Sequence, residues 1–344
     1  MAARSSSSKS LTVAITGPTG EIGHSVLEAL ERSREVRRVV GMARRPFDAK
    51  ASGLRKLTYH RGDVLDRAAV EQLVEGADVV VHLAFIIMGG AEESRAVNLE
   101  GSRNVFEAST EAGVGRLVYT SSVAAYGFHR DNPQPLTEDV PARGSDSHYY
   151  SAQKAEVEAL LESAIAGTST EAYVFRPCIV AGPGAPLLID SLPYTQVSER
   201  LPAPVLSLLE GVPILKPVLP DPGVPFQLIH HDDVASAMRA AVIGRGAPGA
   251  YNLAGTGRLT VGQLADELGW YSIPVPELAV DAVAEMVGRL GFLPAQAQWI
   301  SAFREPVIMS TAKARRELRW RPRHGALQTL RETITSARMD KLIR

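Results

Sequence analysis

The chain has 344 residues, a formal net charge of −1, 45% hydrophobic and 22% charged residues, a composition that excludes disordered and fibrous proteins. Its 37 basic and 38 acidic residues are scattered along the chain, so we expect neither nucleic acid nor an anionic membrane as a partner. The single cysteine, Cys178, cannot form an internal disulfide, and no Cys/His spacing predicts a metal site.

The amino terminus, MAARSSSSKS, lacks the apolar segment of a signal peptide, and we expect residues 1–10 to form a disordered tail. The most apolar later window, LPAPVLSLLEGVPILKPVLP, contains five prolines, whereas a membrane helix needs about 20 mainly apolar residues with intact backbone hydrogen bonds. We therefore expect no membrane span. The lone cysteine fits a reducing cytoplasm.

Short runs of β-branched residues alternate with amphipathic, helix-length runs over the first half of the chain. The predicted strands are 11–16, 36–43, 57–64, 77–85, 116–122 and 171–177, and the predicted helices are 24–33, 68–76, 96–113 and 151–164. This alternation is typical of βαβ units. It predicts an α/β fold with a doubly wound parallel sheet.

The alternation stops after Gly182, where prolines become dense through Gly223, and it returns at FQLIHHDDVASAMRAAV and GAYNLAG. We therefore expect insertions to form a second, smaller, discontinuous lobe. The predicted division is a sheet domain of residues 11–180 plus 226–255, a substrate-binding lobe of residues 181–225 plus 256–320, and a C-terminal helical segment of residues 321–344.

The segment ITGPTGEIG places Gly17, Gly20 and Gly23 between the first strand and the first helix. Glycine at these positions lets the backbone turn tightly, approach a pyrophosphate and pack helix on strand. A purely structural turn could have the same sequence, but the position in the first βα turn favours a dinucleotide site. The mononucleotide alternative lacks its Gly-Lys-Ser/Thr ending. The remaining expected turn contacts are Thr19, Glu21 and Ile22.

The second strand ends in Arg44 and Arg45, where an acidic residue would bind a free ribose hydroxyl. Guanidinium groups suit a 2′-phosphate, so we expect NADP, with NAD as the alternative if both arginines are simply solvated. Further expected cofactor contacts follow the third and fourth strands: Asp63, Val64, Leu83 and Ala84. For Asp63, helix capping is an equal alternative.

The segment HYYSAQK contains two adjacent tyrosines, and Lys154 lies four residues after Tyr150 but five after Tyr149. Residues four apart share a helix face, so Tyr150 is the candidate acid, and the ammonium of Lys154 is expected to lower its pKa. An exposed helix face would show the same spacing. The serines of YTSSVAAYG, Ser121 and Ser122, favour the active-site interpretation because they end a strand at the sheet edge that holds the dinucleotide.

Several motifs together resemble the extended short-chain dehydrogenase/reductase family, also called the NAD-dependent epimerase/dehydratase family. They are TGPTGEIG, GDV, HLA, AVNLEGSRNV, YTSSVAAYG, YSAQK, FRPCIVAGPG, IHHDDVA and YNLAGTGRLT, and the resemblance covers about residues 11 to 320. It implies a Rossmann-type dinucleotide-binding domain, a small-molecule substrate and a homodimer through the helices that begin near Asn98 and Tyr149.

The resemblance also implies roles for individual residues. Tyr150 becomes the acid/base, Lys154 its partner, Ser122 the catalytic serine and Asn98 a further catalytic residue, with Ser121 as a second donor. Arg176 and Pro177 match the segment that leads to nicotinamide. We interpret Cys178 as a buried small residue and His82, His230 and His231 as structural.

Departures from the family pattern guide the prediction of the reaction. The Asp-Glu pair of dehydratases is replaced here by Val123, Ala124 and Ala125, and no arginine occurs in LPDPGVPFQLIHHDD. The loop after the fourth strand is apolar and provides Phe85, Ile86, Ile87 and Met88 as candidate substrate contacts. We therefore expect an NADP-preferring carbonyl reductase or alcohol dehydrogenase. The alternatives are a nucleotide-sugar epimerase and a non-catalytic dinucleotide sensor.

Overall fold

The computed structural model describes residues 10–87, 91–146, 148–185, 187–190, 192, 216–275 and 306–343. The expected tail of residues 1–10 lies almost entirely outside the described residues. Large parts of the predicted substrate lobe, residues 193–215 and 276–305, also lie outside them. The domain boundaries given above therefore stay a prediction.

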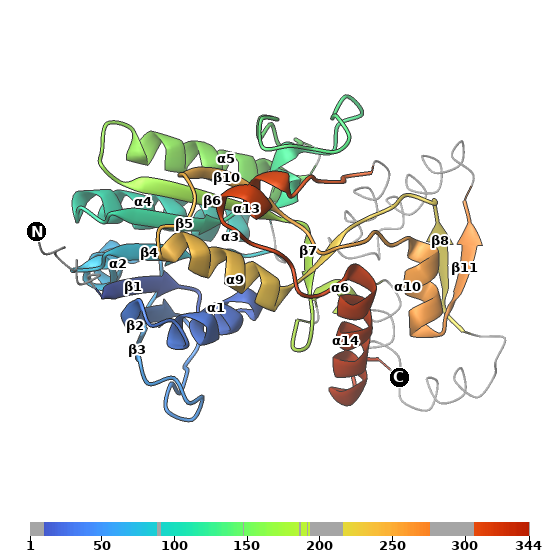
Figure 1. Ribbon diagram of the computed structural model, residues 1–344, viewed down its shortest axis with the longest axis horizontal. Coiled ribbons are helices and arrows are strands. Elements are labelled where there is room, and N and C mark those ends of the chain that lie inside the picture. Colours follow the sequence, from blue (N-terminus) through green and yellow to red (C-terminus); the bar gives the residue numbers. More distant parts are fainter. Residues whose placement is uncertain are drawn as a thin grey trace, which may run out of the picture.

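Seven parallel strands form the central sheet in the order β10-β6-β5-β4-β1-β2-β3 (Figure 1). The strands are β1 (Leu11–Thr16), β2 (Val36–Ala43), β3 (Leu57–Arg61), β4 (Val79–His82), β5 (Arg116–Thr120), β6 (Glu171–Pro177) and β10 (Gly249–Leu253). The order reverses between β1 and β4, where Thr16 pairs with His82. This is the Rossmann-type doubly wound sheet that the sequence predicted, and ligands bind such sheets at the carboxyl edge of the switch point.

Helices cover both faces of the sheet, as the alternation of buried residues along β1 requires. Val13 and Ile15 belong to the hydrophobic cluster beneath α1 (Glu21–Glu31) and α9 (His231–Val242). Ala14 belongs to the cluster on the opposite face, which the remaining helices of the sheet cover. These helices are α2 (Arg67–Val74), α4 (Ser102–Glu111) and α5 (Tyr149–Ile165). Burial of both faces explains why the strands are nearly continuous apolar runs.

The predicted helix 96–113 is not a regular α-helix in the structure. It consists of a π-helical segment, η1 (Ala96–Gly101), followed by α4, and a short helix that the sequence did not predict, α3 (Ala91–Arg95), precedes it. The hydroxyl of Ser102 donates to the backbone oxygen of Asn98 at 2.5 Å, and such bonds between a side chain and the preceding turn compete with regular helix geometry. The periodic spacing of apolar residues in the sequence does not reveal this change from α-helix to π-helix.

Two further elements pack against the sheet domain: the 3₁₀ turn η2 (Val123–Tyr126) contacts α5 and β6, and α13 (Ala312–Glu317) contacts β10. The elements beside the sheet domain (Figure 1) are β7 (Ile179–Ala181), α6 (Leu187–Asp190), β8 (Val218–Asp221), β9 (Leu228–His230), α10 (Val261–Leu268), β11 (Tyr271–Pro274) and α14 (Ala326–Met339). β9 pairs with β7 and β8 with β11, outside the central sheet. α9 packs against α1 and β10 is an edge strand of the central sheet, whereas α14 shares a hydrophobic cluster with α10.

None of the helices in the described part of the chain combines the length and apolar character needed to cross a membrane.

Candidate active site

A cavity of about 310 Å³ lies at the carboxyl edge of the sheet, where the strand order reverses. One wall consists of the glycine turn, the ends of β4 and β5, and the first turns of α5. The opposite wall is apolar and includes Ile179, Val180, Leu187, Leu188, Val224 and Phe226. The sequence did not single out this second wall, because its segments are far apart in the chain and only the fold brings them together.

The glycine turn has the geometry of a phosphate cradle. Gly17 has a φ of +69°, and a Cβ atom there would lie 2.8 Å from the backbone nitrogen of Ala84. A Cβ atom on Gly23 would lie 2.5 Å from the Gly17 oxygen, so both positions require glycine for packing. Gly20 lines the cavity, and its nearest potential Cβ contact is at 3.5 Å. Its lack of a side chain therefore leaves room for a ligand rather than for protein.

The amino terminus of α1 faces this space. Gly20 is its N-cap and supplies no side-chain hydrogen bond, so the first backbone N–H groups are suited to an anion. Glu21 and Ile22 line the cavity, whereas Thr19 is not part of its wall. Burial raises the pKa of the Glu21 carboxyl, an effect that a hydrogen bond from the Leu187 backbone opposes. The residues present thus fit the pyrophosphate of a dinucleotide.

Tyr150 and Tyr149 have different surroundings, as their spacing to Lys154 predicts. Tyr150 lines the cavity, and its ring meets Phe85 edge-on with the ring centroids 5.7 Å apart. The Tyr149 hydroxyl donates to the backbone oxygen of Ile87 at 3.0 Å. Burial raises the pKa of Tyr150 to about 12, and a hydrogen bond with the side chain of Ser122 opposes this shift.

Lys154 lies at the end of β5, beside the candidate acid. Its Nζ donates to the Thr120 backbone oxygen at 2.8 Å and lies 3.5 Å from the centroid of the Phe85 ring. Burial lowers the pKa of Lys154 to about 7, and the charge of Glu158 opposes the shift. The expected lowering of the Tyr150 pKa by Lys154 is not seen in the free protein, where burial raises this pKa.

The hydroxyl of Ser121 is already occupied. It donates to Glu158 at 2.5 Å, and Glu158 in turn accepts from the Nε and Nη2 atoms of Arg176 at 3.0 and 2.5 Å. The guanidinium also lies over the Tyr126 ring, 4.5 Å from its centroid. Through its hydrogen bond with Ser121, this buried ion pair holds the residues that follow β5 in position. Glu158 was not among the residues predicted from the sequence, although it follows Lys154 by four residues on the same face of α5.

Asn98 is fully buried and does not line the cavity. Its side chain accepts from the Ile86 backbone nitrogen at 2.7 Å and donates to the Ile86 oxygen at 3.0 Å. It also donates to Gln153 of α5 at 2.8 Å. These contacts make Asn98 a positioning residue that ties the loop after β4 to the helix of Tyr150.

A buried chain of polar contacts links the glycine turn to the π-helical segment. The hydroxyl of Thr16 and Nδ1 of His82 lie 2.7 Å apart, and His82 Nε2 lies 2.9 Å from the Ser102 hydroxyl. Burial lowers the pKa of His82 to about 3, so this imidazole is neutral. His82 thus joins β1, β4 and α4 behind the cavity.

Of the predicted contacts after β4, Leu83, Phe85 and Ile87 line the cavity, whereas Ala84 and Ile86 do not. Pro177 also lines it, and so does Cys178, which was not predicted as a contact. Burial raises the pKa of the Cys178 thiol, which makes it a poor nucleophile. Met88 is outside the described residues.

The predicted adenosine contacts are farther from the cavity. Arg44 and Arg45 are exposed after β2 and do not line it, and neither do Asp63 and Val64. The Asp63 carboxylate accepts from the Leu65 nitrogen at 3.1 Å. Asp66, not Asp63, caps α2, so helix capping does not explain Asp63.

A doubly wound sheet with a glycine turn at its switch point, and a Tyr-Lys pair at the same edge, is the arrangement of nicotinamide-dependent oxidoreductases. The sequence profile of the NAD-dependent epimerase/dehydratase family matches residues 13–254, and the chain belongs to this family. It is an NAD-dependent enzyme of the extended short-chain dehydrogenase/reductase type.

Three relatives illustrate the sequence similarity. An uncharacterised protein of Sinorhizobium fredii is 26% identical over 332 residues, which cover 94% of this chain and 77% of that protein. A 3β-hydroxysteroid dehydrogenase/decarboxylase of Arabidopsis thaliana is 35% identical over 146 residues, 41% of this chain and 26% of that enzyme. A 2-alkyl-3-oxoalkanoate reductase of Shewanella oneidensis is 29% identical over 184 residues, 51% of this chain and 46% of that enzyme. The last two matches thus span less than half of each enzyme.

Solved structures share the fold over the whole chain. The crystal structure of gox2253 has a TM-score of 0.74 at 24% identity and covers 97% of this chain and 100% of its own. The structure of MoeE5 in complex with UDP-glucuronic acid and NAD has a TM-score of 0.69 at 20% identity and covers 96% and 99%. At these identities the likeness shows the fold alone.

Proposed function

We propose that the protein is an NADP-preferring oxidoreductase that transfers a hydride between nicotinamide and the carbonyl or alcohol group of a small apolar compound. The observation that carries the substrate class is the composition of the cavity wall. Among the residues that the structure describes, its charged members are Glu21 and Lys154, and no arginine lines it. A nucleotide sugar would bring a second pyrophosphate, which proteins usually hold with arginine or lysine.

Tyr150 is the proposed proton donor in reduction. A bound reduced nicotinamide supplies the hydride for the carbonyl carbon. Tyr150 gives its hydroxyl proton to the carbonyl oxygen, which completes the alcohol, while Ser122 donates a hydrogen bond to the same oxygen. A pKa of about 12 keeps Tyr150 protonated at neutral pH, which suits reduction. The Lys154 ammonium would stabilise the phenolate that remains and hold the nicotinamide ribose.

The names of the relatives support an apolar substrate. Those of the Arabidopsis and Shewanella enzymes refer to a hydroxysteroid and an oxoalkanoate. Both kinds of compound are largely hydrocarbon with one oxidisable or reducible group. The apolar wall formed by Leu187, Leu188 and Phe226 would suit such a compound, because burial of hydrocarbon stabilises a complex by about 25 cal/mol per Å².

The proposed preference for NADP rests on Arg44 and Arg45, which are exposed after β2 with no acidic residue beside them. One charge-assisted hydrogen bond contributes about 1.5–3 kcal/mol, so a single well-placed arginine would favour NADPH by roughly tenfold or more. Replacing both arginines by alanine should remove most of this preference and leave the Kd for NADH nearly unchanged.

A matched control is available on the same strand. Arg37 and Arg38 are also exposed, but they lie at the opposite end of β2. Their double alanine variant should retain the preference for NADPH. Tighter binding of NADH than of NADPH by the unmodified protein would contradict the proposal and would mean that Arg44 and Arg45 are merely solvated.

The alternatives are separated by a binding screen. A nucleotide-sugar epimerase would use the same Tyr150, and a non-catalytic sensor would bind the dinucleotide without turnover. In thermal-shift measurements with saturating NADPH, we expect apolar ketones or sterols to raise the Tm further and uridine or thymidine diphosphate to have no effect. Stabilisation by the nucleoside diphosphates alone would favour the epimerase.

We also propose that the protein is a cytoplasmic homodimer that pairs through η1, α4 and α5, as the family resemblance implies. Sedimentation as a monomer at micromolar concentration would contradict the dimer.

A further inference from the structure

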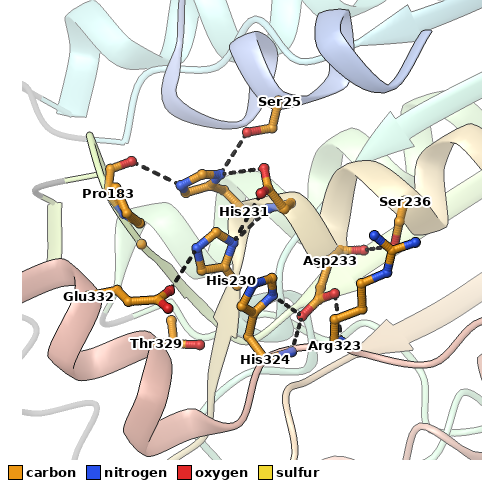
Figure 2. A network of polar contacts seen from close by, with 12 residues as sticks. Ser25, Pro183, His230, His231, Asp233, Ser236, Arg323, His324, Thr329 and Glu332 are labelled. Atoms are coloured by element: carbon orange, nitrogen blue, oxygen red, sulfur yellow. Dashed lines mark hydrogen bonds and ion pairs between the residues drawn. The ribbon is translucent and has the colours of Figure 1, made fainter. Parts of the chain in front are cut away.

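A cluster of histidines and carboxylates lies outside the cavity, where three separate segments of the chain meet (Figure 2). His230 ends β9 and precedes α9, His324 comes from the segment before α14, and Glu332 lies on α14. The Nε2 atom of His230 lies 3.3 Å from a carboxylate oxygen of Glu332. The two imidazole rings are stacked with centroids 4.0 Å apart. One ligand atom from each of the three residues lies within 4.8 Å of the other two.

The tautomer of His324 is fixed by Asp233. The carboxylate of Asp233, whose side chain is 1% exposed, lies 3.0 Å from His324 Nδ1 and also accepts from the backbone nitrogens of Arg323 and His324. A carboxylate that accepts these bonds requires a proton on Nδ1, which leaves the Nε2 lone pair of His324 free to bind a metal ion. A buried carboxylate behind a histidine is the usual support of a metal ligand.

A second combination, His230, His231 and Asp232, is less suitable. The Nε2 atom of His231 lies 2.9 Å from the Pro183 oxygen, and its Nδ1 atom lies near both Ser25, at 2.6 Å, and Asp232, at 3.2 Å. Both ring nitrogens are therefore occupied. Because Ser25 and Asp232 contact the same nitrogen, these residues also do not form a Ser-His-Asp catalytic relay, which needs one partner on each nitrogen.

We propose that His230, His324 and Glu332 form a binding site for a divalent transition-metal ion, with Zn²⁺ as the best match. Two imidazole nitrogens and one carboxylate oxygen are a typical zinc donor set, and water would complete a tetrahedral site. The side chains must rotate and approach one another to bind the ion, because the two rings are stacked and their lone pairs do not yet converge on one point.

Binding also changes the proton position on His230. Its Nδ1 atom accepts from the Asp232 backbone nitrogen at 3.1 Å, so the neutral ring carries its proton on Nε2. When Nε2 binds the ion, this proton moves to Nδ1. The Asp232 carboxylate, 3.8 Å from Nδ1, can then accept a hydrogen bond from the Nδ1–H group. The backbone hydrogen bond that caps α9 is lost, which is a small effect beside the binding of a zinc ion.

The ion would fasten α14 to the β7–β9 sheet near the cavity wall. Thr333 and Ser336 of α14 already accept from the backbone nitrogens of Gly182 and Gly184, which follow β7 and precede the cavity-lining α6. Joining residues 230 and 324 closes a long chain segment, so the cross-link would also reduce the entropy of the unfolded chain. The expected role is structural, and it does not depend on the proposed reaction.

The test is a zinc titration of the full chain after chelator treatment, followed by calorimetry and thermal unfolding. We expect binding of one Zn²⁺ per chain, a raised Tm and no response to Mg²⁺, which prefers oxygen ligands. His324→Gln and Glu332→Gln should each weaken zinc binding by more than tenfold. Cobalt should bind with the visible absorption of a tetrahedral site, a readout that a merely structural polar network would not give.

His60→Gln is the matched control, because His60 is an exposed histidine on β3. It should bind zinc as the unmodified protein does. If His324→Gln fails to fold, Glu332→Gln gives the answer, since that side chain is 36% exposed and its replacement keeps the shape. Equal zinc affinities of the unmodified protein and Glu332→Gln, or loss of binding in His60→Gln, would overturn the proposal.

Discussion

The two adjacent tyrosines on α5 differ in what their hydroxyl groups contact, and this difference yields the first prediction. Tyr150→Phe should lower kcat by about 10²–10⁴-fold, because it removes the proposed proton donor, with little change in the Kd for NADPH. Tyr149→Phe should affect kcat by less than about threefold, since it removes only a hydrogen bond to the Ile87 oxygen. Turnover of Tyr150→Phe at the rate of the unmodified enzyme would refute the assignment.

The buried ammonium of Lys154 predicts how cofactor affinity depends on pH. Its pKa is lowered to about 7, so the group is charged below this pH and neutral above it in the free protein. A cofactor that prefers the ammonium must therefore bind more weakly as the pH rises above 7, by at most tenfold per pH unit. Lys154→Met should bind weakly throughout, and its affinity should not follow this profile. NADPH titrations from pH 6 to 9 provide the measurement, and equal slopes for the two proteins would contradict the role of Lys154.

Candidate site residues could be predicted from the sequence where their spacing places them on the same face of a helix, as for Tyr150 and Lys154. The sequence did not indicate Glu158, whose importance depends on the approach of Arg176 from β6. The prediction of a lowered Tyr150 pKa was wrong for the free protein, because burial, which is a property of the tertiary structure, raises this pKa. The proposed metal site also could not be predicted from the sequence, because His230 and Glu332 come together only in the fold.

At the scale of elements, the turn between β1 and α1 contains one glycine that is needed for packing, Gly23, and one that is expected to be needed for cofactor binding, Gly20. Gly23→Ala places a Cβ atom 2.5 Å from backbone and should lower the free energy of unfolding by roughly 1–3 kcal/mol. Gly20→Ala has its nearest contact at 3.5 Å and a φ of −83°, so its Tm should change little while cofactor affinity falls. Thermal unfolding and NADPH titration of both variants distinguish the two effects. A destabilised Gly20→Ala variant with normal affinity would show that the turn has only a packing role.

Most elements of the sheet domain were predictable because buried parallel strands are continuous apolar runs with a period distinct from that of helices. The strands β2 and β6 match the predicted residues 36–43 and 171–177. The π-helical segment around Asn98 was not predictable, because the spacing of apolar residues does not reveal the local hydrogen bond from Ser102 to Asn98 or the contacts of the Asn98 side chain with Ile86 and Gln153. The pairing of β9 with β7 depends on tertiary packing in the same way.

At the scale of the whole molecule, the carboxyl edge of the central sheet positions the cofactor-binding and substrate-binding walls of the cavity. The strand reversal between β1 and β4 creates the space for a dinucleotide, and the segments after β6 close it with apolar residues. The sequence predicted the first part from the glycine turn. It predicted apolar contacts only from the loop that holds Phe85, because the opposite wall is assembled from β7, α6 and the residues before β9.

The central claim, reduction of an apolar carbonyl compound with NADPH, is tested most directly by measuring turnover. A panel of alkyl ketones, oxosteroids and nucleotide sugars is incubated with the protein and NADPH, and cofactor oxidation and product are both followed. We expect one or more of the apolar carbonyl compounds to be converted to an alcohol, with one NADPH consumed for each alcohol formed. In a parallel incubation with NADP⁺ or NAD⁺ in place of NADPH, conversion of a nucleotide sugar to its epimer without net change in the cofactor, together with no reduction of any apolar carbonyl compound by NADPH, would contradict the account.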